Sequence, residues 1–224
     1  MIFQHTNCPK YQALTRENTN TGRWYNIPTG EKYASITNVL GYGDKPWLDA
    51  WIRNIGKEKA EAEKNRCADR GTAVHLMAER YLNNDPNVTK DQSKFDIQLF
   101  NKLSYSLDKI NNIRAQEIPM YSRQLQIAGT CDCVAEYNGI LSIIDFKTST
   151  KIKNKDMVTD YFMQAAGYSI MYFEMFNVYI NQGVIMIATE KGLFPTVFTI
   201  NIEDYIEPLC EKINKFYDDI SKVS

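Results

Sequence analysis

The chain of 224 residues is long enough for one domain with a sizeable hydrophobic core. Hydrophobic residues make up 44% of it and charged residues 24%, which is typical of a soluble globular protein. The formal net charge of −1 excludes a strongly basic protein that holds nucleic acid through its overall charge. Any contact with a polyanion must therefore come from a local basic patch.

The sequence carries no pattern typical of export, of a membrane span or of a structural metal site. Its first five residues lack the charged and long apolar regions of a signal peptide, and apolar stretches such as 183–188 are too short to cross a bilayer. The odd number of cysteines fits a reducing compartment. Cys131 and Cys133 lack a second pair at zinc spacing, and the other cysteines are not spaced for an iron–sulfur cluster. We therefore expect a cytoplasmic protein that is not secreted, does not contact a membrane and holds no iron–sulfur cluster.

The first half of the chain is predicted to be mainly helical after a short hairpin. Residues 11–35 alternate in polarity and carry turn residues, which predicts the hairpin. Ser35 is suited to cap a helix that begins at Ile36, and Pro46 suits the first position of a helix that continues from Trp47 through Lys64. The helical pattern then extends over 70–82 and 93–111.

The second half changes to a strand period and then alternates between strands and helices. Glu117 to Lys147 is predicted to be extended, with Asn138-Gly139 as a strong two-residue hairpin turn. The later elements are predicted as a helix at 156–179, strands at 183–189 and 193–200, and an amphipathic helix at about 203–220. This order predicts an α/β fold with a central sheet and helices packed on it.

The hairpin at Asn138-Gly139 predicts where two carboxylates lie. If this turn is of type I′, counting outward from it places Asp132 directly opposite Asp145. The two would form a pair without mutual hydrogen bonds, with Cα atoms about 4.5 Å apart. Like charges in such a pair destabilise a sheet, so we expect a cation between them.

Lys147 completes the predicted constellation. Strand alternation places Lys147 on the face of Asp145, with Ile144 and Phe146 on the other face. Its ammonium offsets the repulsion and can stabilise charge that develops on a phosphate. Hard oxygen ligands favour Mg²⁺ or Mn²⁺. The alternative interpretation is a solvated ion pair at the strand ends, but the apolar run 140–144 indicates a buried strand.

Several other polar residues have a structural and a functional interpretation. His75 lies beside the apolar stripe of a predicted helix and is either a core histidine or a metal ligand, with Glu79 four residues away. Glu117 is either a metal-site acid or a solvated strand start. Gln164 and Tyr168, also four apart, belong either to a surface face or to the site.

The segment after the predicted active strand is rich in lysine. Phosphate contact is predicted for Thr148, Ser149, Lys151 and Lys153, with Lys155 as a further cation, because this segment lies beside the proposed metal site. The alternative is a solvated loop. Elsewhere, four aromatic residues either stack on unpaired bases or pack in the core: Trp24, Tyr25, Trp47 and Trp51. Cys131 and Cys133 are expected to point opposite to Asp132 and to pack under the helices.

Four segments resemble, in order, the motifs of RecB-type PD-(D/E)XK nucleases. They are the G-x-x-x-H motif at 71–75, the G-x-x-D motif at 129–132, the signature strand Ile143-Ile144-Asp145-Phe146-Lys147-Thr148-Ser149, and the Q-x-x-x-Y motif at 164–168. The stretch from Asp132 through Ser149 particularly resembles the mitochondrial genome maintenance exonucleases and related viral exonucleases.

The resemblance implies a restriction-endonuclease-like core of order α-β-β-β-α-β and metal-dependent cleavage of DNA from its ends. It implies Asp132, Asp145, His75 and the Phe146 carbonyl as metal ligands and Lys147 as the catalytic lysine. Gln164 and Tyr168 would position Lys147 or the DNA backbone. It also implies a viral source and the interior of a host cell, and replication or recombination proteins as partners.

The sequence thus predicts a single nuclease domain over 1–224, with an N-terminal hairpin and helices at 1–69 and the core at 70–224. The expected activity is hydrolysis of DNA from its ends with one or two Mg²⁺ or Mn²⁺ ions, in DNA recombination, repair or degradation. Three alternatives stay open at this stage: an endonuclease or flap nuclease on the same core, a DNA-binding module without hydrolysis, and a metallohydrolase acting on a small molecule.

Overall fold

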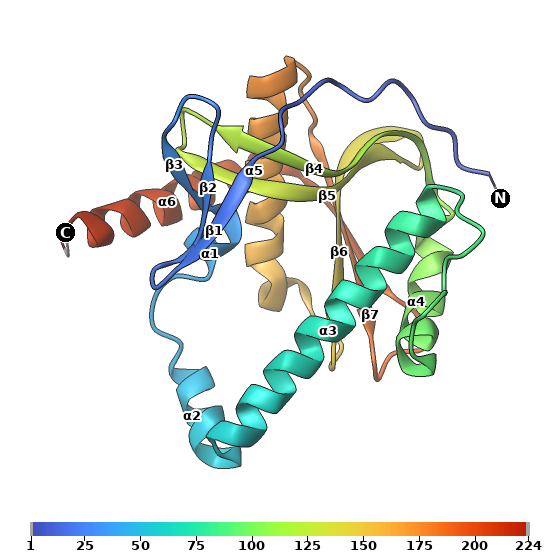
Figure 1. Ribbon diagram of the computed structural model, residues 1–224, viewed down its shortest axis with the longest axis horizontal. Helices are drawn as coiled ribbons and strands as arrows, with labels where there is room; N and C mark the ends of the chain where they lie inside the picture. Colours follow the sequence, from blue (N-terminus) through green and yellow to red (C-terminus); the bar gives the residue numbers. More distant parts are fainter. Residues whose placement is uncertain (1, 223–224) are drawn as a thin grey trace.

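The computed structural model describes residues 2–222 of the chain. They form an α/β fold in which one mixed sheet carries helices on both faces (Figure 1). The strands are β1 (Thr15–Thr19), β2 (Gly22–Asn26), β3 (Lys32–Ser35), β4 (Ile110–Ser122), β5 (Ile127–Tyr137), β6 (Ile140–Ser149), β7 (Gln182–Thr189) and β8 (Thr196–Asn201). The helices are α1 (Ile36–Leu40), α2 (Pro46–Ile55), α3 (Lys57–Leu82), α4 (Lys94–Leu107), α5 (Thr159–Phe176) and α6 (Ile206–Ser221), with single 3₁₀ turns η1 (Lys155–Val158) and η2 (Ile202–Tyr205).

The predicted order of the core is confirmed. Helices α3 and α4 precede the three strands β4, β5 and β6, and α5 then leads into β7. β6 and β7 pair in parallel, with α5 as the crossover between them, while β4–β5, β5–β6 and β7–β8 pair antiparallel. The predicted N-terminal hairpin is also present as β1 and β2, and β3 joins it to the same sheet.

Two hydrophobic clusters lie on opposite faces of the sheet. One joins α1, α5 and α6 to the sheet and includes Phe162, Tyr168 and Phe216. The other joins α3 and α4 to it and includes Met77 and Leu103. The site described below therefore has a core on each side, and Figure 1 shows α3 crossing one side of the sheet with α5 on the other. No helix in the described part of the chain combines the length and apolar character needed to cross a bilayer.

One edge of β5 is shared by two strands that leave a gap between them. β4 occupies the other edge along the whole of β5, from Ile127 to Tyr137. On the remaining edge, β3 pairs only with Ile127 and Ala128, whereas β6 pairs only from Cys133 onward. The segment 129–132 between these two ladders is the G-x-x-D motif. The fork places this motif at an opening in the sheet, where that edge of β5 has no neighbouring strand within residues 2–222.

Strand alternation changes phase at the same opening. In β5, Cys131 packs in the cluster under α5, whereas Cys133 packs in the cluster under α3 and α4. In β4, Glu117 lies across from Asp132 between the paired positions 116 and 118, and its φ of 47° is left-handed. The expectation that both cysteines pack on one face is wrong, because the strand is irregular between them.

Several predicted boundaries differ from the observed ones. The helix expected from Trp47 through Lys64 is broken at Gly56, whose φ of 87° favours glycine. The helix expected over 93–111 ends at Leu107, and the strand expected from Glu117 already begins at Ile110. The division proposed at residue 69 falls inside α3.

Candidate active site

The hairpin between β5 and β6 has the predicted turn and register. Asn138 and Gly139 both have positive φ, 51° and 79°, as a type I′ turn requires. Tyr137 pairs with Ile140, and the ladder continues outward to Cys133 and Ile144. It ends there, one pair before Asp132 and Asp145, so the expected direct pair is wrong. β6 instead continues its ladder with β7, and the Phe146 N–H donates a hydrogen bond to Asp132 Oδ2 at 2.7 Å.

Three potential metal ligands converge at the opening. One ligand atom each of His75, Glu117 and Asp132 lies within 4.8 Å of the others. His75 comes from α3, Glu117 from β4 and Asp132 from β5. His75 Nδ1 is 3.6 Å from Asp132 Oδ2, and the Asp132 side chain is only 10% exposed. Imidazole and carboxylate groups at this spacing suit a divalent cation.

Glu117 lies at the exposed rim of this cluster. Its left-handed φ of 47° is uncommon for a residue other than glycine and places it in a sparsely populated conformation. Partial burial of the carboxyl group and the nearby Asp132 carboxylate raise its pKa to about 7, although His75 acts in the opposite direction. The structure thus holds two carboxyl groups together against their repulsion, an arrangement that a cation would relieve.

Asp145 and Lys147 form a buried ion pair beside the cluster. Asp145 is 0% exposed, and Lys147 Nζ lies 2.5 Å from its Oδ2. Burial raises the pKa of Asp145, Lys147 lowers it, and Asp132 raises it further, with a net shift upward. Burial lowers the pKa of Lys147, but the Asp145 and Asp132 carboxylates outweigh this and leave it above its ordinary value. Lys147 also lies over the Tyr161 ring, 5.1 Å from its centroid.

The residues present fit a divalent cation. Within residues 2–222, neither carboxylate oxygen of Asp145 receives a hydrogen bond of normal geometry, although both are buried. A buried carboxylate with so little compensation is costly unless a positive charge lies near it. Lys147 supplies one such charge, and a cation bound at His75, Glu117 and Asp132 would supply a second.

The motif residues on α5 contact the motif on β5. Gln164 Nε2 donates a hydrogen bond to the Tyr168 hydroxyl at 3.1 Å, and both side chains are buried. A Cβ at Gly129 would lie 2.8 Å from Tyr168 Cε1, so Tyr168 packs directly on the glycine of the G-x-x-D motif. The contacts seen for Gln164 and Tyr168 are thus with each other and with the glycine of β5, while Lys147 lies over the ring of Tyr161.

The residues predicted to contact nucleic acid lie at the end of β6. The Thr148 hydroxyl accepts a hydrogen bond from Arg70 Nε at 3.2 Å, and the Ser149 hydroxyl donates to the Lys151 carbonyl at 2.7 Å. Lys151 is exposed and Lys153 half-exposed, and neither forms an ion pair within the described residues. The two hydroxyls therefore shape the loop, whereas the two ammonium groups face solvent.

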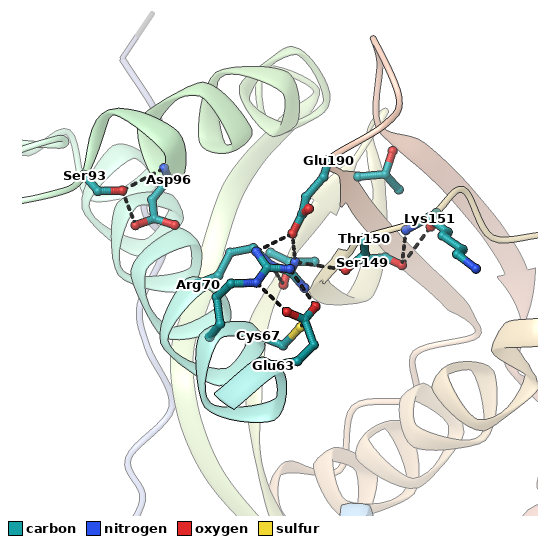
Figure 2. A network of polar contacts seen from close by, with 12 residues as sticks. Glu63, Cys67, Arg70, Ser93, Asp96, Ser149, Thr150, Lys151 and Glu190 are labelled. Carbon is teal, nitrogen blue, oxygen red and sulfur yellow. Dashed lines mark hydrogen bonds and ion pairs between the residues drawn. The ribbon is translucent and has the colours of Figure 1, made fainter. Parts of the chain in front are cut away.

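Arg70 fastens this loop to α3. Figure 2 shows its guanidinium between Glu190 and the end of β6. It forms an ion pair with Glu190 and donates to the Thr150 hydroxyl at 3.4 Å, and its side chain is only 5% exposed. Glu190 also accepts from Arg66 Nη1 at 2.8 Å. The helix that carries His75 is thereby connected to the ends of β6 and β7.

The aromatic candidates divide between core and surface. Trp24 packs toward Phe216, with ring centroids 6.3 Å apart, and Tyr25 is buried, as the core interpretation predicts. Trp51 is half-buried on α2, and Trp47 on the same helix is 69% exposed. Sequence reasoning assigned no role to Arg70 or Tyr161. The available signals were that Arg70 precedes the G-x-x-x-H motif and that Tyr161 lies one helical turn before Gln164.

Comparison with known proteins gives consistent relatives but no family model that matches. The chain is 26% identical over 151 residues to mitochondrial genome maintenance exonuclease 1 of Xenopus tropicalis, covering 65% of this chain and 43% of that protein. For the proteins of the same name from Mus musculus and Homo sapiens the identity is 25%, covering 70% and 65% of this chain and 50% and 44% of theirs. The chain thus spans about half the length of the relatives it matches.

Among solved structures, a crystal structure of an exonuclease candidate from Eubacterium rectale aligns with a TM-score of 0.45 and 14% identity, covering 67% of this chain and 66% of that one. The three sequence relatives have the same name and match about two thirds of the chain. They confirm the resemblance to PD-(D/E)XK exonucleases that the four motifs indicate, and they support a nuclease.

Proposed function

We propose that this chain is a metal-dependent DNA nuclease that hydrolyses phosphodiester bonds from DNA ends. The observation that carries the proposal is the cluster of His75, Glu117 and Asp132 next to the buried pair of Asp145 and Lys147. The similarity to exonucleases supports the reaction class, and the name of these relatives supports a role in maintaining or degrading DNA.

His75, Glu117 and Asp132 would hold the divalent cation, with Asp145 close behind them. A hard ion such as Mg²⁺ or Mn²⁺ suits the carboxylate oxygens, and Mn²⁺ tolerates the histidine nitrogen well. When bound, the ion neutralises charge on the phosphate and makes water a better nucleophile. Glu117, for which the sequence left a metal-site acid and a solvated strand start open, thus joins the proposed ligand set, whereas the expected ligand Asp145 is not among the three grouped residues. The Phe146 carbonyl remains a proposed ligand.

The protein's own residues contribute orientation and charge. The Phe146 N–H fixes one oxygen of Asp132, so that the carboxylate keeps one direction. Lys147, held by Asp145 and Tyr161 with its pKa above the ordinary value, stays protonated at neutral pH. Its ammonium is therefore available to stabilise the negative charge that develops on the phosphate during hydrolysis. The exposed Lys151 and the half-exposed Lys153, which follow β6, would contact neighbouring phosphates.

The proposal is tested by incubating the protein with linear and circular DNA, each single- and double-stranded, in Mg²⁺, Mn²⁺ or EDTA. We expect both linear forms or one of them to be degraded in Mg²⁺ or Mn²⁺, with circles left intact and no cleavage in EDTA. Nicking of circles would instead identify an endonuclease on the same core. Binding of DNA without cleavage in either metal would contradict a nuclease and identify a binding module.

A further inference from the structure

A second part of the site lies on the N-terminal hairpin, which lines the same cavity as two of the candidate metal ligands. The cavity has a volume of about 270 Å³. Its lining includes Glu117 and Asp132 together with Arg16, Arg23 and Tyr25 of the hairpin. It therefore combines carboxylates, which suit a cation, with two guanidinium groups to which no role has yet been given.

The register of the hairpin explains why both arginines reach the cavity. Arg16 pairs with Tyr25 and Asn18 pairs with Arg23, so these side chains share one face of the two-stranded ribbon. The opposite face is used differently, because Trp24 packs toward Phe216. The hairpin is thus fixed by its tryptophan face and presents its arginine face to the cavity.

Tyr25 connects this arginine face to the opening in the sheet. Its side chain is buried, and its hydroxyl lies 3.5 Å from the hydroxyl of Thr130. Thr130 belongs to the segment of β5 between its two ladders, which ends at Asp132. The arginines are therefore carried by a hairpin that is attached next to the metal ligands, rather than by a separate surface loop.

Neither arginine has a partner that explains its position. Within residues 2–222, the guanidinium groups of Arg16 and Arg23 take part in no hydrogen bond or ion pair, and both residues are exposed. Other arginines of the chain behave differently: Arg66 and Arg70 share the carboxylate of Glu190. Two free guanidinium groups that line the same cavity suit an anion with several oxygens.

We propose that Arg16 and Arg23 bind a phosphate group of the nucleic-acid strand whose neighbouring phosphodiester bond lies at His75, Glu117 and Asp132. This inference rests on the proposed nuclease function and adds a substrate contact to it. The nucleic-acid strand would then be held by two sets of basic residues from different parts of the chain, the lysines after β6 and the arginines of the hairpin. The phosphate is either an internal phosphodiester or a terminal phosphate, since the guanidinium chemistry is the same for both.

The test uses Arg16→Gln/Arg23→Gln and a control, Lys109→Ala/Lys215→Ala, which also removes two exposed cations but none that line the cavity. Binding is measured in EDTA against single-stranded oligonucleotides with a hydroxyl or a phosphate at each end, over a range of salt concentrations. Circular dichroism and melting temperature establish that the variants fold. The single variants Arg16→Gln and Arg23→Gln replace the double variant if it does not fold.

We expect the arginine variant to bind about tenfold more weakly, with little change in the control. In a plot of the logarithm of the binding constant against the logarithm of the salt concentration, the magnitude of the slope should fall by about 0.7 for each phosphate that the variant no longer binds. Weaker binding confined to phosphorylated ends identifies a terminal phosphate, and equally weaker binding of all oligonucleotides identifies an internal one. Binding and salt slope equal to those of the control would overturn the inference.

The outcome for the arginines is separable from the outcome for the nuclease. If the wild type cleaves DNA but the arginine variant binds like the control, only the phosphate site is wrong. If the wild type binds through the arginines but cleaves nothing with Mg²⁺ or Mn²⁺, the phosphate site stands and the nuclease function is wrong. If the wild type neither binds nor cleaves, both are wrong.

Discussion

Glu117 and Asp145 are carboxyl groups that the fold holds in unfavourable surroundings. Glu117 adopts a left-handed backbone conformation next to Asp132, and Asp145 is fully buried with Lys147 as its charged neighbour. In both cases the pKa is raised above its ordinary value. Raised carboxyl pKa values in one place are typical of functional sites, because a stable fold would otherwise avoid them.

The raised pKa of Glu117 predicts a pH-dependent stability. Its carboxyl pKa is about 7 in the folded chain against an ordinary 4.5, so the folded state holds the proton more tightly than the unfolded one. The metal-free protein therefore loses stability as pH rises from the lower value to the higher one. Glu117→Gln removes this loss. We expect its melting temperature in EDTA to exceed that of the wild type by an amount that grows across this window and then levels off.

A control and a metal titration make the Glu117 prediction specific. Glu211→Gln on α6 removes an exposed carboxylate outside the cluster, and it should show no such window. Saturating Mn²⁺ should raise the wild-type melting temperature more than that of Glu117→Gln. If the melting temperatures of wild type and Glu117→Gln differ by the same amount at every pH, the Glu117 carboxyl group does not cause the loss of stability with rising pH.

His75 offers a second test at a single residue, since the chain has only one other histidine, His5. His75→Ala should weaken Mn²⁺ binding about tenfold or more, measured by calorimetry, and should reduce cleavage more in Mg²⁺ than in Mn²⁺. DNA binding in EDTA should change little. His5→Ala is the matched control, because the His5 ring bonds to the Leu82 carbonyl at 2.9 Å and lies outside the cluster. Unchanged Mn²⁺ affinity in His75→Ala would make His75 a core residue.

The sequence predicts single residues well where one period governs them. Alternation along β6 places Asp145 and Lys147 on one face and Ile144 and Phe146 on the other, as the structure confirms through the ion pair and the cluster under α3 and α4. The proximity of Asp132 and Glu117 was not predictable in this way. It depends on an irregularity shared by two strands, and a left-handed residue inside a strand leaves no regular pattern in the sequence.

At the level of elements, the site arises where β5 parts from β6. Both strands are long, and they stop pairing with each other at Cys133 and Ile144. On this edge β5 pairs with β3 at Ile127 and Ala128, whereas β6 keeps only its pairing with β7, which runs from Ser142 to Ser149. Asp132 then satisfies the Phe146 N–H at the point of divergence. The hairpin turn at Asn138-Gly139 sets the register between β5 and β6. The site is open because the two strands stop pairing just before Asp132 and Asp145.

Arg70 and Glu190 connect the elements around this opening, which predicts a large effect on stability. Arg70→Met removes a buried cation that serves Glu190, Thr148 and Thr150. We expect the free energy of unfolding, from urea denaturation, to fall by about 3 kcal/mol, because the remaining carboxylate is largely buried. The free energy of unfolding of the double variant Arg70→Met/Glu190→Met should fall by less than the sum of the decreases in the two single variants.

Arg66→Met is the matched control for Arg70. It contacts the same carboxylate of Glu190, but its side chain is 41% exposed, so its removal should cost less than about 1 kcal/mol. If Arg70→Met lowers the free energy of unfolding no more than Arg66→Met does, the buried ion pair does not hold α3 to the strand ends.

Element boundaries were less predictable than element types. The break at Gly56 follows from a single glycine between two segments that are both predicted to be helical, an amphipathic one before it and a highly charged one after it. The early start of β4 at Ile110 is explained by its pairing with the end of β5, which is a contact between distant parts of the chain. Such a contact between distant segments cannot be predicted from the local strand or helix propensity of the residues.

For the molecule as a whole, the sequence predicts the α/β class and the core order because strand and helix periods alternate clearly after Glu117. The structure adds that the N-terminal hairpin belongs to the same sheet through β3, so that 1–69 is not a separate layer. This connection places Arg16 and Arg23 at the cavity next to Asp132. The residues that surround the site therefore come from widely separated parts of the described chain.

Lys147 and Asp145 form an ion pair beside the three candidate metal ligands, and we propose that this pair belongs to the centre of a DNA nuclease. The decisive measurement is the single-turnover rate of cleavage of linear DNA in Mn²⁺ for the wild type and Lys147→Ala, with Lys109→Ala as the control for a removed surface cation. We expect that the wild type cleaves, that Lys109→Ala matches it, and that Lys147→Ala is slower by roughly a thousandfold or more while remaining folded. A folded Lys147→Ala protein that cleaves at the wild-type rate would show that Lys147 takes no part in the reaction.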